Sequence, residues 1–440
     1  MNAWGYPPKS GTSLCYHLRS ISSPSIGSLG HVFRRIRSAL NPPVTGGEKT
    51  ADALKFGILG AAHSAAWALL NPARMHREVI PYAVAARDRK RAEEFASKNN
   101  IPVVKDNYQD LLDDPEIDCI LVPLPNAYHF EWAVRAIKAG KHVLLEKPSV
   151  SNAIEAEKLF NLPEFSQPNA PVLLEAFHYR FHPAWSLFMA QINKPDVVHV
   201  DTWCMIPWWF VNKDHIHFNY NLAGGTMMGM GTYTFAALRE IFGTEPEECL
   251  SADTKAFTEG VHHDCDYEFK AKFKFPGGHV GEAFSTLQGP TIWSPSYTTV
   301  THRQVEVPDD SLPKGQIKLL TREVTLHGWI HAIFWHRLDI KQHFEVQDSA
   351  GRVLDKWTEI TSKKAYTGEE AGGDLAEFGG ETHWMSFRYQ LEQFVNRVKG
   401  RETAYWMDRE DSLKQMKMLD MAYVKSGLGI RPTSNYIDKV

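Results

Sequence analysis

The stretch Leu54-Lys-Phe-Gly-Ile-Leu-Gly60-Ala-Ala62-His-Ser-Ala65 decides the fold of this chain. It starts as a short apolar strand, passes through a turn of small residues and opens a helix. A dinucleotide pyrophosphate binds at such a junction, because small residues let the phosphates approach the backbone and the helix N-terminus offers free N–H groups. The usual pattern is G-x-G-x-x-G/A, and Ala62 replaces its middle glycine. The stretch therefore predicts a dinucleotide-binding turn.

A second signal lies at Glu146-Lys147-Pro148, which again follows an apolar, strand-like run. The proline restricts the backbone, so the lysine side chain can be held rigidly against a cofactor. Partial burial there would lower the pKa of the lysine toward the useful range of about 7–8. Such a tripeptide alone is more often a surface turn. Together, the two signals predict a cofactor and a catalytic Lys147 at one edge of a sheet.

Strand-like and helical runs alternate from Leu54 onward. Strands are expected at Lys55–Leu59, Val79–Ala86, Val103–Val104, Cys119–Val122, His142–Glu146 and Val172–Ala176. Helices are expected at Asp88–Lys98, Tyr108–Leu112, Tyr128–Ala139 and Asn152–Phe160. This alternation is typical of a doubly wound parallel sheet, which binds ligands beyond the carboxyl ends of its strands. Gly60, Arg87, Pro123 and Lys147 all fall at such ends.

The pattern changes to alternating, β-rich runs after about residue 196. These runs are Val197–Cys204, Asp266–Phe275, His279–Leu287, Tyr297–Val305, Gln316–Leu326 and Ile340–Val346. They predict a mostly antiparallel sheet of five or more strands, followed by helices over Thr382–Lys399 and Asp411–Ser426. We therefore predict an extension (1–50), an α/β Rossmann domain (51–178) and an α+β domain (179–440). The C-terminal helices from about residue 382 are expected to pack back on the Rossmann domain.

The composition excludes several classes of function. A net charge of -4 over 440 residues gives no reason to expect nucleic acid or an anionic membrane as a partner. No apolar run approaches the roughly 18–20 residues that a membrane span requires. The five cysteines are scattered without C-x-x-C spacing, which indicates reduced thiols and no zinc site. The run His262–Asp266 is not expected to bind a metal either, because adjacent side chains alternate sides on a strand.

The first fifty residues differ from the rest of the chain. No acidic residue precedes Glu48, while arginines and serines are frequent. This composition resembles an organellar transit peptide, and the segment from Ile26 to Leu40 could form a short basic amphipathic helix at a membrane surface. We favour a disordered extension on a cytoplasmic protein, with mitochondrial targeting as the alternative.

Arg87 and Asp88 follow the second predicted strand, where NAD-binding folds usually place an acid for the ribose hydroxyls. An arginine there favours the 2′-phosphate of NADP, which predicts NADP(H) as the cofactor. Asp88 would repel that phosphate unless it caps the following helix. The alternative interpretation is that Arg87 is a solvated loop charge.

Several motifs occur in an order that is far more specific than any one of them. They are Gly57–Ala62, Ala85–Asp88, Pro123–Asn126, Glu146–Pro148, Glu175–Pro183 and Gly224–Tyr233. With these motifs, the chain resembles the Gfo/Idh/MocA family of NAD(P)-dependent oxidoreductases over roughly residues 54–435. Within that family it is most similar to the fungal-type dihydrodiol dehydrogenase and D-xylose dehydrogenase branch.

The resemblance implies hydride transfer between NADP(H) and a carbohydrate or diol carbon, in a protein that forms a homodimer through an open sheet. It implies that Lys147 is the catalytic lysine and Tyr233 a proton donor, and we expect His182 to assist them. The residues expected to bind the cofactor are Gly60, Ala62, His63, Ser64, Arg87, Pro123, Asn126 and Glu146. Those expected near the substrate are His178, Arg180, Trp208, His217 and Gly229.

The departures from the family pattern cluster around the expected site. Gly229 occupies the place of the third-motif aspartate, while His63 and Trp67 add bulk beside the cofactor turn. Losing one acid–base or orienting group costs on the order of 10²–10⁴ in rate. Two hypotheses follow. The chain is a dehydrogenase with an altered substrate, or it is a redox-silent member repurposed as a lyase, cyclase or isomerase in secondary metabolism. A purely structural role is a third, weaker hypothesis.

Aromatic and histidine side chains cluster between the second and third motifs. The aromatic residues are Trp203, Trp208, Trp209, Phe210, Phe218 and Tyr220. Such residues more often fill a core, but this place in the family order predicts an apolar cap over the substrate. We therefore expect a cyclic or aromatic-derived diol, ketone or secondary metabolite. His215 and His217 alternate and could face one side of a strand.

Overall fold

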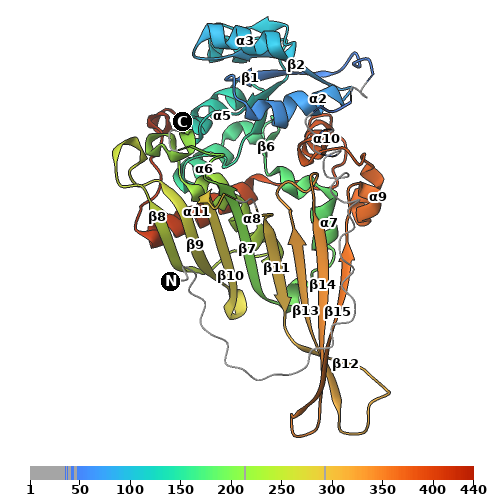
Figure 1. Cartoon of the computed structure of the whole chain (residues 1–440). Helices are drawn as coiled ribbons and strands as arrows, with labels where there is room; N and C mark the ends of the chain where they lie inside the picture. The colour runs from blue at the N-terminus through green and yellow to red at the C-terminus, as the bar shows by residue number, and fades with distance from the viewer. Residues whose placement is uncertain (1–34, 36, 38–40, 44–46, 213–214, 292–293) are drawn as a thin grey trace.

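The computed structural model describes residues 35, 37, 41–43, 47–212, 215–291 and 294–440. Two sheets organise the chain: a Rossmann domain forms the upper part of Figure 1 and a long, open sheet forms the lower part. Cys15 and most of the predicted extension lie outside the described residues; of the helix expected between Ile26 and Leu40, only Arg35 and Arg37 are described, both as helical.

The first sheet has six parallel strands in the order β3-β2-β1-β4-β5-β6. They are β1 (Leu54–Leu59), β2 (Val79–Ala85), β3 (Val103–Val104), β4 (Cys119–Val122), β5 (His142–Leu145) and β6 (Leu173–Glu175). β4 is apolar throughout and Lys55 is the one charged residue of β1, because helices cover both faces of a doubly wound sheet. The predicted α/β Rossmann fold is confirmed, with the strand order of dinucleotide-binding domains.

The connections of this sheet are short helices and single turns. The helices are η1 (Ala66–Leu70), α2 (Asn71–Arg74), α3 (Arg89–Asn99), α4 (Tyr108–Leu112), α5 (His129–Lys138) and α6 (Ala153–Phe160). The turns are η2 (Asn126–Tyr128), η3 (Pro163–Ser166) and η4 (His178–Phe181). Asp88, Asn107 and Asn152 each accept a hydrogen bond from a first-turn amide, which fixes where α3, α4 and α6 begin.

The second sheet has the order β15-β14-β13-β11-β7-β10-β9-β8, with β12 paired to β13. Its strands are β7 (Val197–Pro207), β8 (Glu248–Ala256), β9 (Asp266–Phe275), β10 (His279–Gly289), β11 (Tyr297–His302), β12 (Val305–Val307), β13 (Ile317–His327), β14 (Arg337–Gln347) and β15 (Val353–Lys363). Only β7 and β10 pair in parallel, so the sheet is mostly antiparallel as predicted.

Two strands of this sheet, β8 and β15, were not predicted, and the predicted strand Tyr297–Val305 is divided into β11 and β12. β15 is an edge strand in which every residue except Trp357 is exposed. An edge strand exposed on both faces has no reason to alternate apolar and polar residues, so the period-two signal is missing. β8 is the opposite edge strand and carries several polar residues.

Helices cover one face of the second sheet and leave the other face open (Figure 1). The covering helices are α7 (Pro183–Met189), α8 (Thr232–Phe242) and α11 (Arg409–Ser426). On the open face, the half-buried rings of Phe284, Trp203 and Tyr297 stack across β10, β7 and β11, with ring planes within 9° of parallel. The rings thus form a local apolar patch on this open face, which also carries charged side chains such as Glu282 and Lys272.

The C-terminal helices lie against the Rossmann domain. α10 (Ser386–Val398) packs on η1 and α2, and α11 packs on α6. The short helices α9 (Gly368–Ala371) and η11 (Gly373–Phe378) lie between β15 and the start of α10. The remaining single turns are η5 (Lys194–Asp196), η6 (Ile216–Phe218), η7 (Tyr220–Leu222), η8 (Met227–Gly231), η9 (Gly260–His262), η10 (Pro276–Gly278) and η12 (Asn435–Lys439).

A fully buried ion pair ties the C-terminal segment to the second sheet. Arg431 Nη2 lies 2.9 Å from Asp266 Oδ1, and both side chains have 0% exposure. Arg431 Nε also donates to the carbonyl of Gly224 at 2.7 Å. Gly225 has a φ of +130°, and a Cβ there would collide with the Asp266 carboxylate. The pair thus positions the glycine turn that leads into η8 and the candidate site.

Candidate active site

The loop between β1 and the first helix has the geometry of a phosphate-binding turn. Gly60 has a φ of +95°, and a Cβ there would lie 3.1 Å from Leu124. No hydrogen bond from the backbone amides of Ala61, Ala62 or His63 occurs among the residues that the structure describes. These free donors beside a helix start fit a pyrophosphate. Ala62 is half-buried, whereas His63 and Ser64 are exposed at the turn.

Arg87 and Arg91 flank the next loop of the same sheet edge. Arg87 is exposed, and Arg91 Nη2 donates to the carbonyl of Ala61 at 3.4 Å. Asp88 accepts from the amide of Arg91 as the N-cap of α3, so its carboxylate is engaged by the helix start. The expected conflict between Asp88 and a 2′-phosphate is thereby relieved. Arg91 was missed from the sequence, although its place in the first turn of α3 was a usable signal.

Lys147 lies at the carboxyl end of β5, at the junction of the two domains. Its Nζ donates to the carbonyl of Gly229 at 2.6 Å and lies 4.4 Å from the centroid of the Tyr233 ring. Burial lowers the pKa of Lys147, against the opposing effect of Glu146 and Glu175. Burial also raises the pKa of Glu175 to about 7, so this acid is only partly ionised at neutral pH. The Lys147 side chain is thus half-buried, and the two carboxyl groups offset part of its positive charge.

Tyr233 and His178 form a hydrogen-bonded pair next to Lys147. Tyr233 Oη lies 3.1 Å from His178 Nε2, and His178 Nδ1 lies 2.8 Å from Ser386 Oγ. Burial raises the pKa of Tyr233 well above its usual value and lowers that of His178 well below its usual value. Both groups are therefore neutral at pH 7, and the imidazole can carry its single proton on either nitrogen. This arrangement can pass a proton to and from the tyrosine hydroxyl.

His217 faces Gly229 from the turn η6. A Cβ on Gly229 would lie 3.6 Å from His217 Nδ1 and 3.8 Å from Leu287, both ordinary contact distances. His217 packs on His215 with ring centroids 4.7 Å apart. Burial and the charge of Lys147 lower the pKa of His217 to about 3. The histidine predicted near the substrate is therefore neutral and lies beside the position of the missing aspartate.

His331 belongs to the same cleft and was not predicted. It lies in the connection between β13 and β14, and its ring stacks on His178 at a centroid distance of 5.5 Å. Its side chain is exposed, yet the surrounding protein and Lys147 lower its pKa to about 4. These two properties fit a residue that lines a deep but open cleft. No sequence motif marks His331, because the packing of the β13–β14 connection brings it there.

Five other expected site residues have contacts or burial that the sequence did not indicate. His182 caps α7 by accepting from the Ala184 amide and makes no described contact with Lys147 or Tyr233. Arg180 is buried in ion pairs with Glu240 and Asp411. Asn126 donates to the carbonyl of Ala223 at 2.9 Å, and a carboxylate oxygen of Glu146 accepts from the Lys147 amide. Pro123 is buried at the end of β4.

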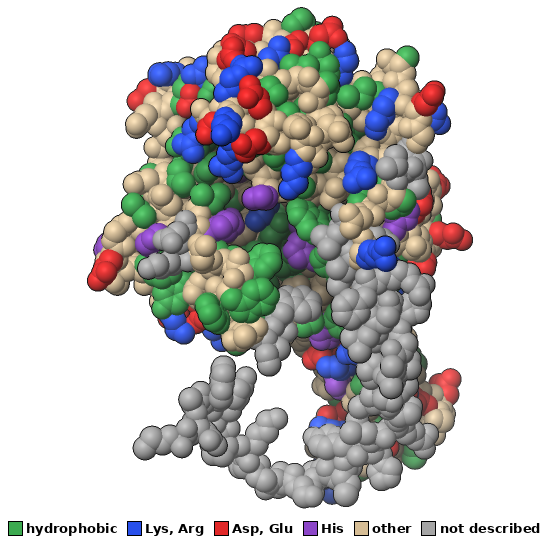
Figure 2. Space-filling view, turned by 45° about the horizontal axis from the view of Figure 1, so that its top comes forward, with side chains coloured by type: hydrophobic (Ala, Val, Ile, Leu, Met, Phe, Trp, Pro, Cys, Tyr) green, Lys and Arg blue, Asp and Glu red, His purple; other side chains and the backbone are tan. Residues whose placement is uncertain are grey.

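The aromatic run does not form one continuous cap. Trp203 lies on the open face of the sheet, and Phe218 is buried. Trp208, Trp209 and Phe210 are exposed after β7, at 54%, 55% and 70%. Figure 2 shows a hollow below the Rossmann domain, with several histidines on its wall and apolar side chains along one rim.

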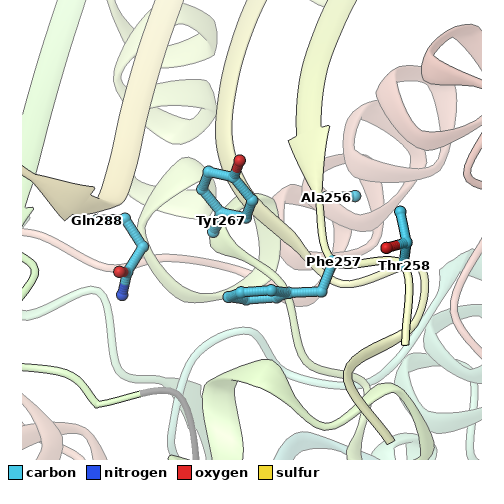
Figure 3. A pocket seen from close by; sticks show the side chains of 5 residues that line it. All are labelled: Ala256, Phe257, Thr258, Tyr267 and Gln288. Atoms are coloured by element: carbon cyan, nitrogen blue, oxygen red, sulfur yellow. The ribbon is translucent and has the colours of Figure 1, made fainter. Parts of the chain in front are cut away.

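A separate cavity of about 380 Å³ lies at the ends of β8, β9 and β10. Figure 3 shows the rings of Phe257 and Tyr267 and the amide of Gln288 around it. Phe257 also contacts Phe218 at a centroid distance of 5.1 Å. Neither Lys147 nor Tyr233 lines this cavity, so it is distinct from the histidine-rich cleft.

The described part of the chain offers no group of three or more His, Cys, Asp or Glu side chains arranged to hold a metal ion. The cysteines within it, Cys119, Cys204, Cys249 and Cys265, are buried free thiols. None of the helices described here has the length and apolarity needed to cross a membrane.

Comparison with known proteins places this geometry in context. Residues 54–167 match the family model GFO_IDH_MocA, described as an oxidoreductase family with an NAD-binding Rossmann fold. The chain is 27% identical over 380 residues to D-xylose 1-dehydrogenase (NADP(+)) 2 of Haloferax volcanii, covering 86% of this chain and 98% of that protein. It is 31% identical over 239 residues to dTDP-3,4-didehydro-2,6-dideoxy-alpha-D-glucose 3-reductase of Saccharopolyspora spinosa, covering 52% of this chain and 68% of that protein.

Among solved structures, a 3-ketoreductase from Actinomadura kijaniata in complex with NADP and TDP-benzene superposes with a TM-score of 0.59 at 19% identity. The match covers 84% of this chain and 96% of that one. At this identity it supports the two-domain fold alone. The six-stranded parallel sheet and the separate, mostly antiparallel sheet thus have a common precedent.

Proposed function

Because the chain belongs to the Gfo/Idh/MocA family of oxidoreductases, we propose that it transfers a hydride between NADP(H) and a secondary alcohol or carbonyl carbon. The expected substrate is a cyclic diol, a sugar-like compound or a secondary metabolite. The observation that carries the proposal is the juxtaposition of Lys147 with the neutral Tyr233–His178 pair beside a phosphate-binding turn.

The protein's part in the reaction is proton transfer and charge stabilisation at the substrate oxygen. The nicotinamide, when bound, supplies or accepts the hydride. In the direction of reduction, Tyr233 donates the hydroxyl proton to the new alkoxide oxygen, and His178 passes its Nε2 proton to Tyr233 Oη while its Nδ1 takes up a proton through Ser386 Oγ, so that the imidazole stays neutral. The Lys147 ammonium stabilises negative charge on the same oxygen. In oxidation, each proton moves in the opposite direction.

Arg87 supports a preference for NADP(H) over NAD(H). An Arg87→Ala variant is expected to weaken NADPH binding about 10- to 100-fold, because a charge-assisted hydrogen bond contributes about 1.5–3 kcal/mol. NADH binding should stay unchanged, since NADH lacks the 2′-phosphate. Titration of intrinsic tryptophan fluorescence with each cofactor measures both constants.

The neighbouring Arg89→Ala variant is the matched control, because Arg89 pairs with Glu93 on the exposed side of α3. Equal loss of NADPH affinity in the two variants would contradict a specific role for Arg87. If the wild-type protein binds neither cofactor, the redox proposal itself fails, and the lyase, cyclase or isomerase hypothesis takes its place. Gly229 is the feature that keeps this alternative open.

We also propose that the chain forms a homodimer through the open face of the second sheet, because the described helices all lie on its other face and Trp203 and Phe284 form a half-buried apolar patch there. A Trp203→Arg variant should weaken dimerisation about 30-fold or more, as expected for the loss of a central aromatic contact of about 2 kcal/mol. Light scattering after size-exclusion chromatography measures the mass. Trp209→Arg is the control, because Trp209 is exposed outside this face. A wild-type monomer, or loss of the dimer in both variants, would contradict the proposal.

A further inference from the structure

The substrate side of the cleft is lined by imidazoles and one ammonium group. The charged or titratable neighbours that act on His178, His217 and His331 are Lys147 and other histidines, with no carboxylate among them. Burial is the main reason that the pKa of each of these neutral histidines is lowered, and Lys147 lowers it further, so the Lys147 ammonium is the positive charge of this surface. A ligand with a negative charge is the natural complement of such a surface.

The carboxylates that act on Lys147 come from the Rossmann domain. Glu146 precedes the lysine in the chain and accepts from its amide. Glu175 is buried at the end of β6 and accepts from the amide of Ser149 at 2.8 Å. Both come from the Rossmann sheet; they offset part of the charge of Lys147, but neither acts on His178, His217 or His331.

Gly229 presents no side chain at the centre of this surface. Its carbonyl holds Lys147 Nζ at 2.6 Å, while the nearest atoms to a Cβ would be those of the His217 ring at 3.6 and 3.8 Å. An anion bound next to Gly229 would therefore have the lysine ammonium and the His217 imidazole as neighbours. Charge-assisted hydrogen bonds of this kind are about twice as strong as neutral ones.

We propose that the substrate of this enzyme carries a carboxylate, and that the carboxylate binds beside Gly229 between Lys147 and His217. The inference rests on the proposed oxidoreductase function and names its substrate class: a sugar acid or a cyclic polyol acid. A neutral sugar or diol leaves the positive surface without a partner and binds more weakly.

Binding of a matched pair of probes tests the proposal without requiring turnover. Calorimetric titration of the wild-type protein, with and without saturating NADPH, compares D-glucuronate with D-glucose, which lacks the carboxylate. We expect D-glucuronate to bind about 10- to 100-fold more tightly, the effect of one or two charge-assisted hydrogen bonds. Equal affinity, tighter binding of D-glucose, or binding of neither probe would overturn the proposal.

Two substitutions at one position separate charge from size. Gly229→Asp places a carboxylate in the proposed site and should remove the preference for D-glucuronate. Gly229→Asn has nearly the same size without the charge and should retain most of it. Loss of the preference in both variants would indicate steric blocking and overturn the electrostatic assignment. NADPH binding, measured in parallel, reports separately on the proposed oxidoreductase function, so the two failures are distinguishable.

Discussion

Replacing Lys147 with methionine is expected to lower kcat/KM by about 10²–10⁴-fold, the usual effect of removing an acid–base or charge-stabilising group. The affinity for NADPH should change little, because the phosphate-binding turn and Arg87 lie away from the substitution. The reason is geometric: Lys147 Nζ is held at the Gly229 carbonyl and over the Tyr233 ring, where the substrate oxygen is expected. Steady-state kinetics with the best substrate of a carbonyl and diol screen measures the effect.

The pH dependence provides a second measurement on the same residue. Because burial lowers the pKa of Lys147 from 10.5, the basic limb of the pH–rate profile that reports this lysine should lie below pH 10.5. That limb should disappear in Lys147→Met. Lys138→Met is a control for loss of positive charge, since Lys138 is exposed at the end of α5. A Lys147→Met variant with near wild-type kcat/KM would contradict the proposed mechanism.

Replacing Arg431 with methionine is expected to destabilise the protein by about 3–5 kcal/mol, because it leaves the buried Asp266 carboxylate without its cation. The remaining donors to this carboxylate are the Met227 amide, at 2.7 Å, and the Tyr423 hydroxyl, at 2.9 Å. They are neutral and do not replace the charge. The free energy of unfolding from denaturant titration measures the loss.

An exposed ion pair on the neighbouring strands provides the comparison. Glu268 pairs with Lys255 at 2.6 Å, where the lysine side chain is 63% exposed. Glu268→Gln should therefore change the free energy of unfolding by less than about 1 kcal/mol. Replacing Arg431 and Asp266 together with apolar residues should cost less than the sum of the single changes, because no uncompensated charge stays buried. Additive single effects would show that the pair does not act as a unit.

Much of the fold was predictable because apolar residues recur at regular spacing within single strands and helices. The bounds of β9 and α4 agree with the predicted ranges, because each has a clear pattern of apolar residues. The same reasoning missed β15, whose residues are almost all exposed and therefore unconstrained by burial. The prediction for the N-terminal extension rested on its amino-acid composition alone, and this segment lies largely outside the described residues.

The candidate site, like the fold, was only partly predictable from the sequence. Gly60 and Lys147 were predicted because a turn and a strand end are features of neighbouring residues. His182 and Arg180 lie in a motif that pointed to the substrate, yet their described contacts are a helix cap and buried ion pairs. A motif specifies the order of residues along the chain, but the direction of each side chain depends on the elements that pack around it.

By itself, the sequence determined the doubly wound sheet, the dinucleotide turn and the place of Lys147 at a strand end, because these depend on the spacing of neighbouring residues. Only the tertiary structure decided which side chains meet at the lysine. Tyr233 comes from α8, His178 from η4, Ser386 from α10 and His331 from the β13–β14 connection. These elements are far apart along the chain, and the physical reason for their meeting is the burial of the helices and loops between two sheets.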